Sequence, residues 1–180
     1  MSLDISGSVE PRSDQLNYDD VAANDLTITI TDVKQGPPDQ PVHLHNAEFP
    51  GRPYKPGKSM RRVLIAAWGT DAAQYVGKRI QLFGDPTIRF GKEAVGGIRI
   101  RALSHIPGPL DVKLTVTRGK RENFTVTPLL TVNEVAAWLT EASTMDALKT
   151  AWVRVTQAGF GQQLDALKEE RKAAISAADS

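Results

Sequence analysis

The chain has 180 residues, 41% of them hydrophobic and 24% charged, and its formal net charge is +1. These values are typical of a folded globular protein and exclude a chain that is disordered throughout. The sequence has no cysteine and no run of about 20 apolar residues such as a membrane helix needs, so we expect a protein of a reducing cytoplasm, outside any membrane.

The small net charge conceals a strong segregation of charge along the chain. Residues 1–25 hold one Arg against six acids, residues 26–128 hold sixteen Lys or Arg against eight acids, and residues 129–180 hold five against seven. A basic middle region between acidic ends favours a polyanionic partner, because Lys and Arg displace the counterions that surround phosphates. The alternative is a solvated surface whose asymmetry arose by chance.

The N-terminal third of the chain alternates between strand patterns and loops. Residues 1–24 are acidic and without periodicity, which predicts a flexible acidic tail. Alternation of apolar and polar residues over 26–33 and again over 42–45 predicts two half-buried strands. The proline-rich segment 35–41 between them is expected to be a loop, and the prolines of 49–57 allow at most a short edge strand.

The hydrophobic period changes at Lys58. Apolar residues at 60, 63, 64, 67 and 68 recur at helical spacing and predict an amphipathic helix, with a second short helical piece over 71–76. Alternation then returns and predicts strands over 79–84, 87–90, 98–103, 112–117 and 123–127. The last two strands flank the basic segment 118–122, which predicts a hairpin with a basic tip.

The remainder of the chain has helical patterns throughout. Thr131-x-x-Glu134 is a capping box that opens a helix through about Glu141, and Ser143-x-x-Asp146 opens a second. A third helix is expected over 162–177. Trp138 and Trp152 stand among apolar helical positions, so we expect them in the core of these helices.

The order strand, strand, weak strand, helix, strand, strand is that of the OB-fold, a five-stranded barrel. We therefore predict an α+β, mainly β protein, with an OB-like barrel and an additional β-hairpin over 25–128 and a C-terminal helical region over 129–180. The loops that bind ligands in OB-folds would be 35–41 and 91–97. The same elements also fit an unrelated α+β sandwich.

The candidate binding residues are basic side chains close to aromatic rings, the combination that single-stranded nucleic acid needs. Alternation puts Arg99 and Arg101 on the face of their strand opposite Ile98 and Ile100. Among the aromatic residues, Tyr54 is the preferred stacking candidate, whereas Phe90 and Phe124 are expected in the core. The full set is Tyr54, Lys55, Lys58, Arg61, Arg62, Arg89, Lys92, Arg99, Arg101, Arg118, Lys120 and Arg121.

No catalytic constellation stands out, so we expect a non-enzymatic protein without a cofactor. Gly51-x5-Gly57-Lys58-Ser59 has one residue too many between its glycines for a P-loop, although a helix start here can hold one phosphate of a polymer. His43 and His45 share a strand face at a spacing that metal sites use, but only Glu48 is near as a third ligand. Polar surface positions are the preferred interpretation, and a metal at these histidines stays open.

Three segments resemble a family of small phage and prophage proteins: Tyr54–Gly69 (YKPGKSMRRVLIAAWG), Gly77–Pro86 (GKRIQLFGDP) and Val95–Ile106 (VGGIRIRALSHI). The family is found mostly in actinobacterial phages, among genes for replication and recombination, and its members are described as single-stranded-DNA-binding. The resemblance covers about residues 26–127 and, more loosely, the tryptophan-bearing helices after 131. It identifies no binding residue.

The resemblance implies single-stranded-DNA binding during phage DNA replication or recombination, in the host cytoplasm. Separately, the acidic balance and two tryptophans of the C-terminal helices indicate packing or contact with replication or recombination proteins, and a homo-oligomer is also open. The chain ends Ala-Ala-Asp-Ser, without the acidic, phenylalanine-terminated tip of bacterial single-strand binders, so recruitment through such a tip is not expected. The alternative is a phage interaction or inhibitory module that binds a host protein.

Overall fold

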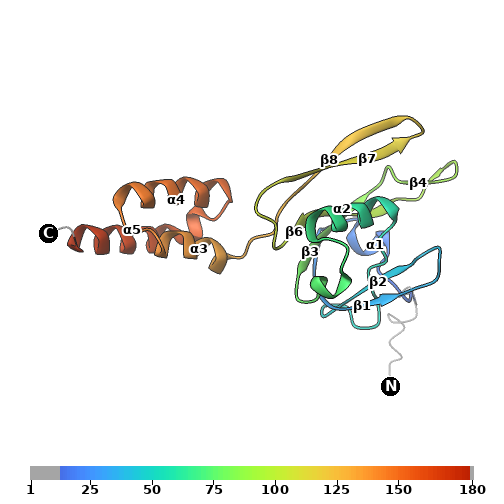
Figure 1. The fold of residues 1–180 in the computed structure, drawn as a ribbon, viewed down its shortest axis with the longest axis horizontal. Coiled ribbons are helices and arrows are strands. Elements are labelled where there is room, and N and C mark those ends of the chain that lie inside the picture. The colour runs from blue at the N-terminus through green and yellow to red at the C-terminus, as the bar shows by residue number, and fades with distance from the viewer. Residues whose placement is uncertain (1–12, 179–180) are drawn as a thin grey trace, which may run out of the picture. The chain divides into compact units, whose positions relative to one another are not determined.

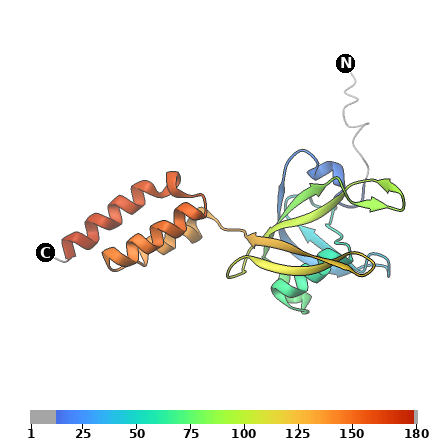
Figure 2. The same cartoon turned by 90° about the horizontal axis from the view of Figure 1, so that it is seen from above.

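The computed structural model describes residues 13–178, and the chain divides into two compact units between Leu129 and Leu130, next to the predicted boundary at 128. The first unit is built on a mixed β-sheet and the second is helical, so the protein is α+β (Figures 1 and 2). None of the helices in the described part of the chain is long and apolar enough to cross a membrane.

The sheet of the first unit has six strands in the order β2-β1-β3-β6-β8-β7, and a separate two-stranded ribbon is formed by β4 and β5. The strands are β1 (Leu26–Gln35), β2 (Val42–Asn46), β3 (Arg79–Asp85), β4 (Arg89–Phe90), β5 (Glu93–Ala94), β6 (Gly97–Leu103), β7 (Leu110–Thr117) and β8 (Lys120–Pro128). The β6–β8 pair is parallel, and the other pairs are antiparallel.

Strand β1 takes part in two different pairings along its length. Residues 26–29 pair with β3, residues 30–35 pair with β2, and the register shifts at Thr31. On the other side of β2, the backbones of Leu44 and Tyr54 exchange two hydrogen bonds of 2.9 Å. The weak third strand expected over 49–57 is thus a single bridge at Tyr54.

The sheet is not closed into a barrel among the described residues. β6 pairs with β8 only through Ala102 and Leu103, and β8 then continues as one half of the long β7–β8 hairpin. Next to this short pairing, the Ile100 amide donates to the Sδ atom of Met60 at 3.3 Å instead of to a strand. The Met60 side chain therefore occupies the edge of β6 at which the third strand, here reduced to the Tyr54 bridge, would pair to close a barrel.

Helix α2 (Lys58–Trp68) covers the inner face of the sheet, as its sequence pattern predicts. Its buried residues are Met60, Val63, Leu64 and Trp68, and they pack with the strand residues Ile28, Ile30, Leu44, Ile80, Leu82, Ile100 and Leu103. The Trp68 indole donates to the Ser104 carbonyl at 2.9 Å. A 3-10 turn, η2 (Ala72–Tyr75), follows, and its Tyr75 ring meets the Trp68 ring edge-on at 5.2 Å.

The segment 87–90 is not a strand of the main sheet, contrary to the sequence-based prediction. The Asp85 carboxylate accepts hydrogen bonds from the amide and hydroxyl of Thr87, at 2.9 and 2.6 Å, and so forms a turn at the end of β3. The chain leaves the sheet at this turn and forms the β4–β5 ribbon before it returns as β6.

The prediction that residues 1–24 are a flexible tail is wrong from residue 13 onward; residues 1–12 lie outside the described part. A short helix, α1 (Tyr18–Val21), packs on β3 and β6, and Leu16 and Val21 are only 4% and 2% exposed. The Tyr18 ring lies where a side chain at Gly84 or Gly96 would stand. Two apolar anchors in an acidic segment are too few to produce a periodic pattern, which is why the sequence did not reveal them.

The second unit contains three helices, α3 (Val132–Thr140), α4 (Met145–Gln157) and α5 (Gly161–Ala178). The predicted Thr131–Glu134 capping box is present, whereas α4 is capped by Thr144 and not by Ser143. Residues buried between the helices include Val135, Leu139, Leu148, Val155 and Ile175. Trp138 and Trp152 pack at the margin of this core, each with a cation over its ring.

Candidate nucleic-acid interface

Arg99 and Arg101 lie on the outer face of β6, each against an aromatic ring. Ile100 between them is fully buried, whereas the side chains of Arg99 and Arg101 are 28% and 50% exposed. The Arg101 guanidinium lies 4.3 Å from the centre of the Phe83 ring, and that of Arg99 lies 5.1 Å from the centre of Phe124. The β3–β6 register shifts at Arg101, and such a bulge re-aims the side chain that it carries.

Both arginines have acidic neighbours. Arg101 donates two hydrogen bonds to the Asp25 carboxylate, one of them 3.2 Å long, and Arg99 lies 3.3 Å from Asp85. Burial alone would raise the pKa of Asp85, but the hydrogen bonds from Thr87 and the charge of Arg99 hold it below its usual value. A phosphate at this face must therefore compete with the ionised Asp85 for Arg99 and with the hydrogen bonds from Arg101 to Asp25.

The β4–β5 ribbon carries an exposed aromatic residue between basic ones. Phe90 is 84% exposed, and its neighbours Arg89 and Lys92 are also exposed. The turn passes through Gly91, whose φ of 64° lies in the left-handed region that favours glycine. The expectation that Phe90 belongs to the core is wrong, because the chain has left the sheet before it reaches this residue.

The tip of the β7–β8 hairpin is basic, as the sequence predicts. Thr117 pairs with Lys120, so Arg118 and Gly119 form the turn, and Gly119 has a φ of 83°. Arg118, Lys120 and Arg121 are all exposed. The Glu122 carboxylate lies 2.7 Å from the Lys120 ammonium and raises its pKa. The two arginines at this tip are thus exposed cations that a phosphate can reach.

The β4–β5 ribbon and the β7–β8 hairpin project from the same end of the first unit, as both views in Figures 1 and 2 show. Outward-facing Phe83, Arg99 and Arg101 lie on β3 and β6, and these two strands continue directly into the ribbon. The structure therefore gathers most of the predicted basic residues on two projecting arms and the sheet face beside them.

The basic residues around the start of α2 are more widely dispersed. Lys58 and Arg62 are exposed, whereas Arg61 donates to the Pro56 carbonyl at 2.9 Å. The Lys55 side chain is only 9% exposed, and its ammonium lies 2.9 Å from Asp14, whose pKa it lowers. Lys55 is therefore held by the N-terminal segment.

One pocket connects the start of α2 with the sheet face. It has a volume of about 220 Å³, and it is lined by Gly57, Lys58, Ser59, Met60, Ile88, Gly97, Ile98 and Arg99. Lys58 and Arg99 are the two cations of this lining. They come from segments far apart in the sequence, and the pocket brings them to one place.

Tyr54 is not available for base stacking, so the sequence-based choice of this ring is wrong. Tyr54 is 2% exposed and packs in the core, because its backbone bridge to β2 turns the side chain inward. Its hydroxyl finds no hydrogen-bond partner among residues 13–178, and burial raises its pKa. Tyr54 therefore contributes to the core of the first unit and not to a binding surface.

The histidines of β2 are not part of a ligand cluster in the described chain. Within residues 13–178 no group of three or more His, Asp or Glu side chains is arranged to hold a metal ion. Glu48, the candidate third ligand, instead accepts hydrogen bonds from the amide and hydroxyl of Thr29 at 2.7 and 2.8 Å.

Comparison of the chain with protein-family models, with curated proteins and with solved structures finds no match. The functional conclusion therefore depends on the geometry of the residues described above.

Proposed function

We propose that this protein binds single-stranded DNA through its first unit, without chemical conversion of the DNA, and that it serves phage DNA replication or recombination. The observation that carries the proposal is Phe90, which stands 84% exposed between Arg89 and Lys92 at the tip of the β4–β5 ribbon. An exposed ring adds little to the stability of a fold, whereas each base that stacks on a protein ring gains about 1–3 kcal/mol.

The sheet face supplies a second place for the strand. Phe83 and Phe124 each lie under a guanidinium, so that ring and cation are presented together. The two cations would hold phosphates, whereas the ring faces that they cover leave base stacking to the exposed Phe90, and neither contact depends on base identity. Such a surface favours a single strand over a duplex, because bases within a duplex are already stacked and paired.

The pairing order supports an OB-like interpretation of the first unit. Taken from one side, the order is the Tyr54 bridge, β2, β1, β3 and β6, and α2 lies in the chain between the bridge and β3. This is the neighbour order of an OB barrel that is open between its third and fifth strands. In this interpretation the β4–β5 ribbon is an elaborated fourth-to-fifth-strand loop, one of the two loops with which OB-folds bind oligonucleotides.

The proposal is tested by fluorescence anisotropy with a labelled oligothymidine of about 16 nucleotides, the upper range of an OB-fold site. If four to six phosphates are contacted, the slope of log affinity against log salt will be about −3 to −4, at 0.7 per phosphate on single strands. A duplex of the same length should bind more weakly. Absence of binding at about 50 mM salt, or a slope near zero, refutes the proposal and favours a host-protein-binding module.

A further inference from the structure

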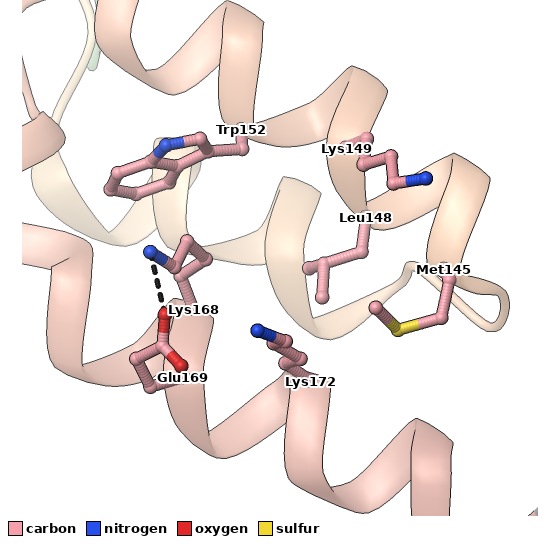
Figure 3. A pocket seen from close by; sticks show the side chains of 7 residues that line it. All are labelled: Met145, Leu148, Lys149, Trp152, Lys168, Glu169 and Lys172. Atoms are coloured by element: carbon pink, nitrogen blue, oxygen red, sulfur yellow. Dashed lines mark ion pairs between the residues drawn. The ribbon is translucent and has the colours of Figure 1, made fainter.

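A pocket in the second unit has no role in the proposed binding of DNA. It lies between α4 and α5 and has a volume of about 190 Å³ (Figure 3). Met145, Leu148, Lys149 and Trp152 line it from α4, and Lys168, Glu169 and Lys172 line it from α5.

The floor of the pocket is apolar and small. Leu148 is 4% exposed, and Met145 and Trp152 are half-buried beside it, three residues and four residues away along the same face of α4. Pockets for small-molecule ligands usually measure about 300–1,000 Å³. The volume here is below that range and suits one inserted side chain rather than a complete cofactor.

The rim of the pocket is basic, although the unit that carries it is acidic. Residues 129–180 hold five Lys or Arg against seven acids, and three of those five are the rim residues Lys149, Lys168 and Lys172. The Lys168 ammonium lies over the Trp152 ring at 4.7 Å and within 2.7 Å of Glu169. Lys149 lies 3.5 Å from the exposed carboxylate of Asp146, and Figure 3 shows the Lys149 and Lys172 side chains on either side of Leu148, apart from the pair of Lys168 with Glu169.

We infer that this pocket binds an acidic peptide segment of a partner protein, with one aromatic or branched aliphatic side chain inserted between Trp152 and Leu148. Carboxylates on both sides of the inserted residue would pair with Lys172 and replace the exposed Asp146 at Lys149. A nucleic-acid strand fits this place poorly, because Lys168 already covers one face of the Trp152 ring and Glu169 and Asp165 stand beside it. The lysines of the rim favour an acidic peptide, and the small volume of the pocket favours a single inserted side chain.

The first experiment uses the full chain and three fluorescein-labelled peptides. The probe peptide is Gly-Asp-Glu-Asp-Phe-Asp-Glu-Asp-Gly; one control has Ser in place of Phe, and the other has Asn and Gln in place of Asp and Glu. We expect the probe to bind at least tenfold more tightly than either control, and its affinity to fall with salt. Equal binding of the Ser peptide, equal binding of the uncharged peptide, or no binding of the probe overturns the inference.

The second experiment places the peptide on the protein. Lys149→Gln with Lys172→Gln should weaken probe binding about threefold to tenfold, as expected for two exposed ion pairs. Ala166→Glu with Ala173→Glu is the matched control, because it changes the net charge equally at exposed positions of α5 that do not line the pocket. An equal loss in both double variants would show a general charge effect and would overturn the site.

Two further readouts separate this site from the DNA interface and from misfolding. Binding of the probe should change the tryptophan fluorescence, and Trp152→Phe should remove that change while circular dichroism stays the same. Oligothymidine affinity should be unaltered in the Lys149→Gln, Lys172→Gln variant. A fluorescence change that persists without Trp152 places the peptide elsewhere and refutes the inference, whatever the outcome for DNA.

Discussion

Two aromatic residues of the first unit have opposite environments, although both stand next to basic residues in the sequence. Tyr54 is buried in the core by a backbone bridge, and Phe90 is exposed at the tip of a ribbon. An aromatic ring can bind a base only if one face of it is open to solvent, so Phe90 is the residue that decides the proposed function.

Phe90→Ala should weaken oligothymidine binding by about 1–3 kcal/mol, that is, roughly fivefold to 150-fold, because one stacked base is lost. The midpoint of thermal unfolding should stay the same, since the ring is exposed. Anisotropy and thermal unfolding measure the two effects. Val153→Ala, at a half-exposed apolar position of α4, is the control, and an unchanged affinity for Phe90→Ala would remove the main support for the interface.

Tyr54→Phe should change the stability of the protein without changing its affinity for DNA. Removal of a buried hydroxyl without a partner among the described residues should raise the free energy of unfolding by about 1 kcal/mol, measured in urea. DNA affinity should be unchanged. A marked loss of affinity in this folded variant would show that the hydroxyl acts in binding.

Substitutions of the two partners in the ion pair between Arg101 and Asp25 should change DNA affinity in opposite directions. Arg101→Ala should weaken DNA binding and reduce the salt slope by about 0.7, the value for one phosphate on a single strand. Asp25→Asn should strengthen binding, because it removes the carboxylate that competes with phosphate for the guanidinium. Titrations across salt concentrations measure both, and changes in the same direction would place the strand away from the outer face of β6.

At the scale of elements, the two projecting arms, which are the β4–β5 ribbon and the tip of the β7–β8 hairpin, should be more flexible than the sheet face beside them. The outer face of β3 and β6 belongs to a sheet with a filled core behind it, whereas the ribbon and the hairpin tip are held only by their own turns and ladders. In the proposed complex, arms of this kind would adapt to a flexible DNA strand, while the sheet would set the direction in which the strand runs.

Arg118→Ala with Arg121→Ala at the hairpin tip should reduce the salt slope by up to about 1.4, with little change in stability, since both side chains are exposed. Lys113→Ala, an exposed lysine on β7 of the same hairpin but away from its tip, is the control. If the control reduces the slope as much per residue removed, the tip has no special role and the effect is one of net charge.

Periodicity was sufficient to predict most of the elements. The helix α2, the alternating strands β1, β3 and β6, the basic hairpin and the Thr131 capping box all follow from local spacing of apolar and capping residues. The ribbon, the burial of Tyr54 and the anchoring of Leu16 and Val21 did not follow, because each depends on a contact with a distant segment. For Phe90, the short Arg-Phe-Gly-Lys sequence after the Asp85–Thr87 turn was the signal that could have indicated an exposed tip.

At the scale of the whole molecule, the two units differ in both structure and charge. The first holds the basic region and the second is acidic except for the rim of its pocket. If the first unit binds DNA and the second binds a protein partner, as we propose, each property can be removed without the other.

A chain that ends at Leu129 should retain oligothymidine affinity within about a factor of three, because the predicted contacts all lie before that residue. Circular dichroism would establish that it is folded. The same shortened chain should bind no acidic peptide. A folded shortened chain with a large loss of DNA affinity would show that the helices take part in binding.

The contact between Asp25 and Arg101 joins residues 76 positions apart, and Leu16 and Val21 are buried against strands that are synthesised much later. Folding rates fall as contacts become more distant in sequence, so the β-unit should fold slowly, whereas α3, α4 and α5 meet over short separations and should fold fast. During synthesis residues 16–25 must therefore wait for β6 before their burial is complete. Residues 16–25 are thus among the last part of this unit to reach their final contacts, and until Asp25 pairs with Arg101 that guanidinium is open to any polyanion nearby.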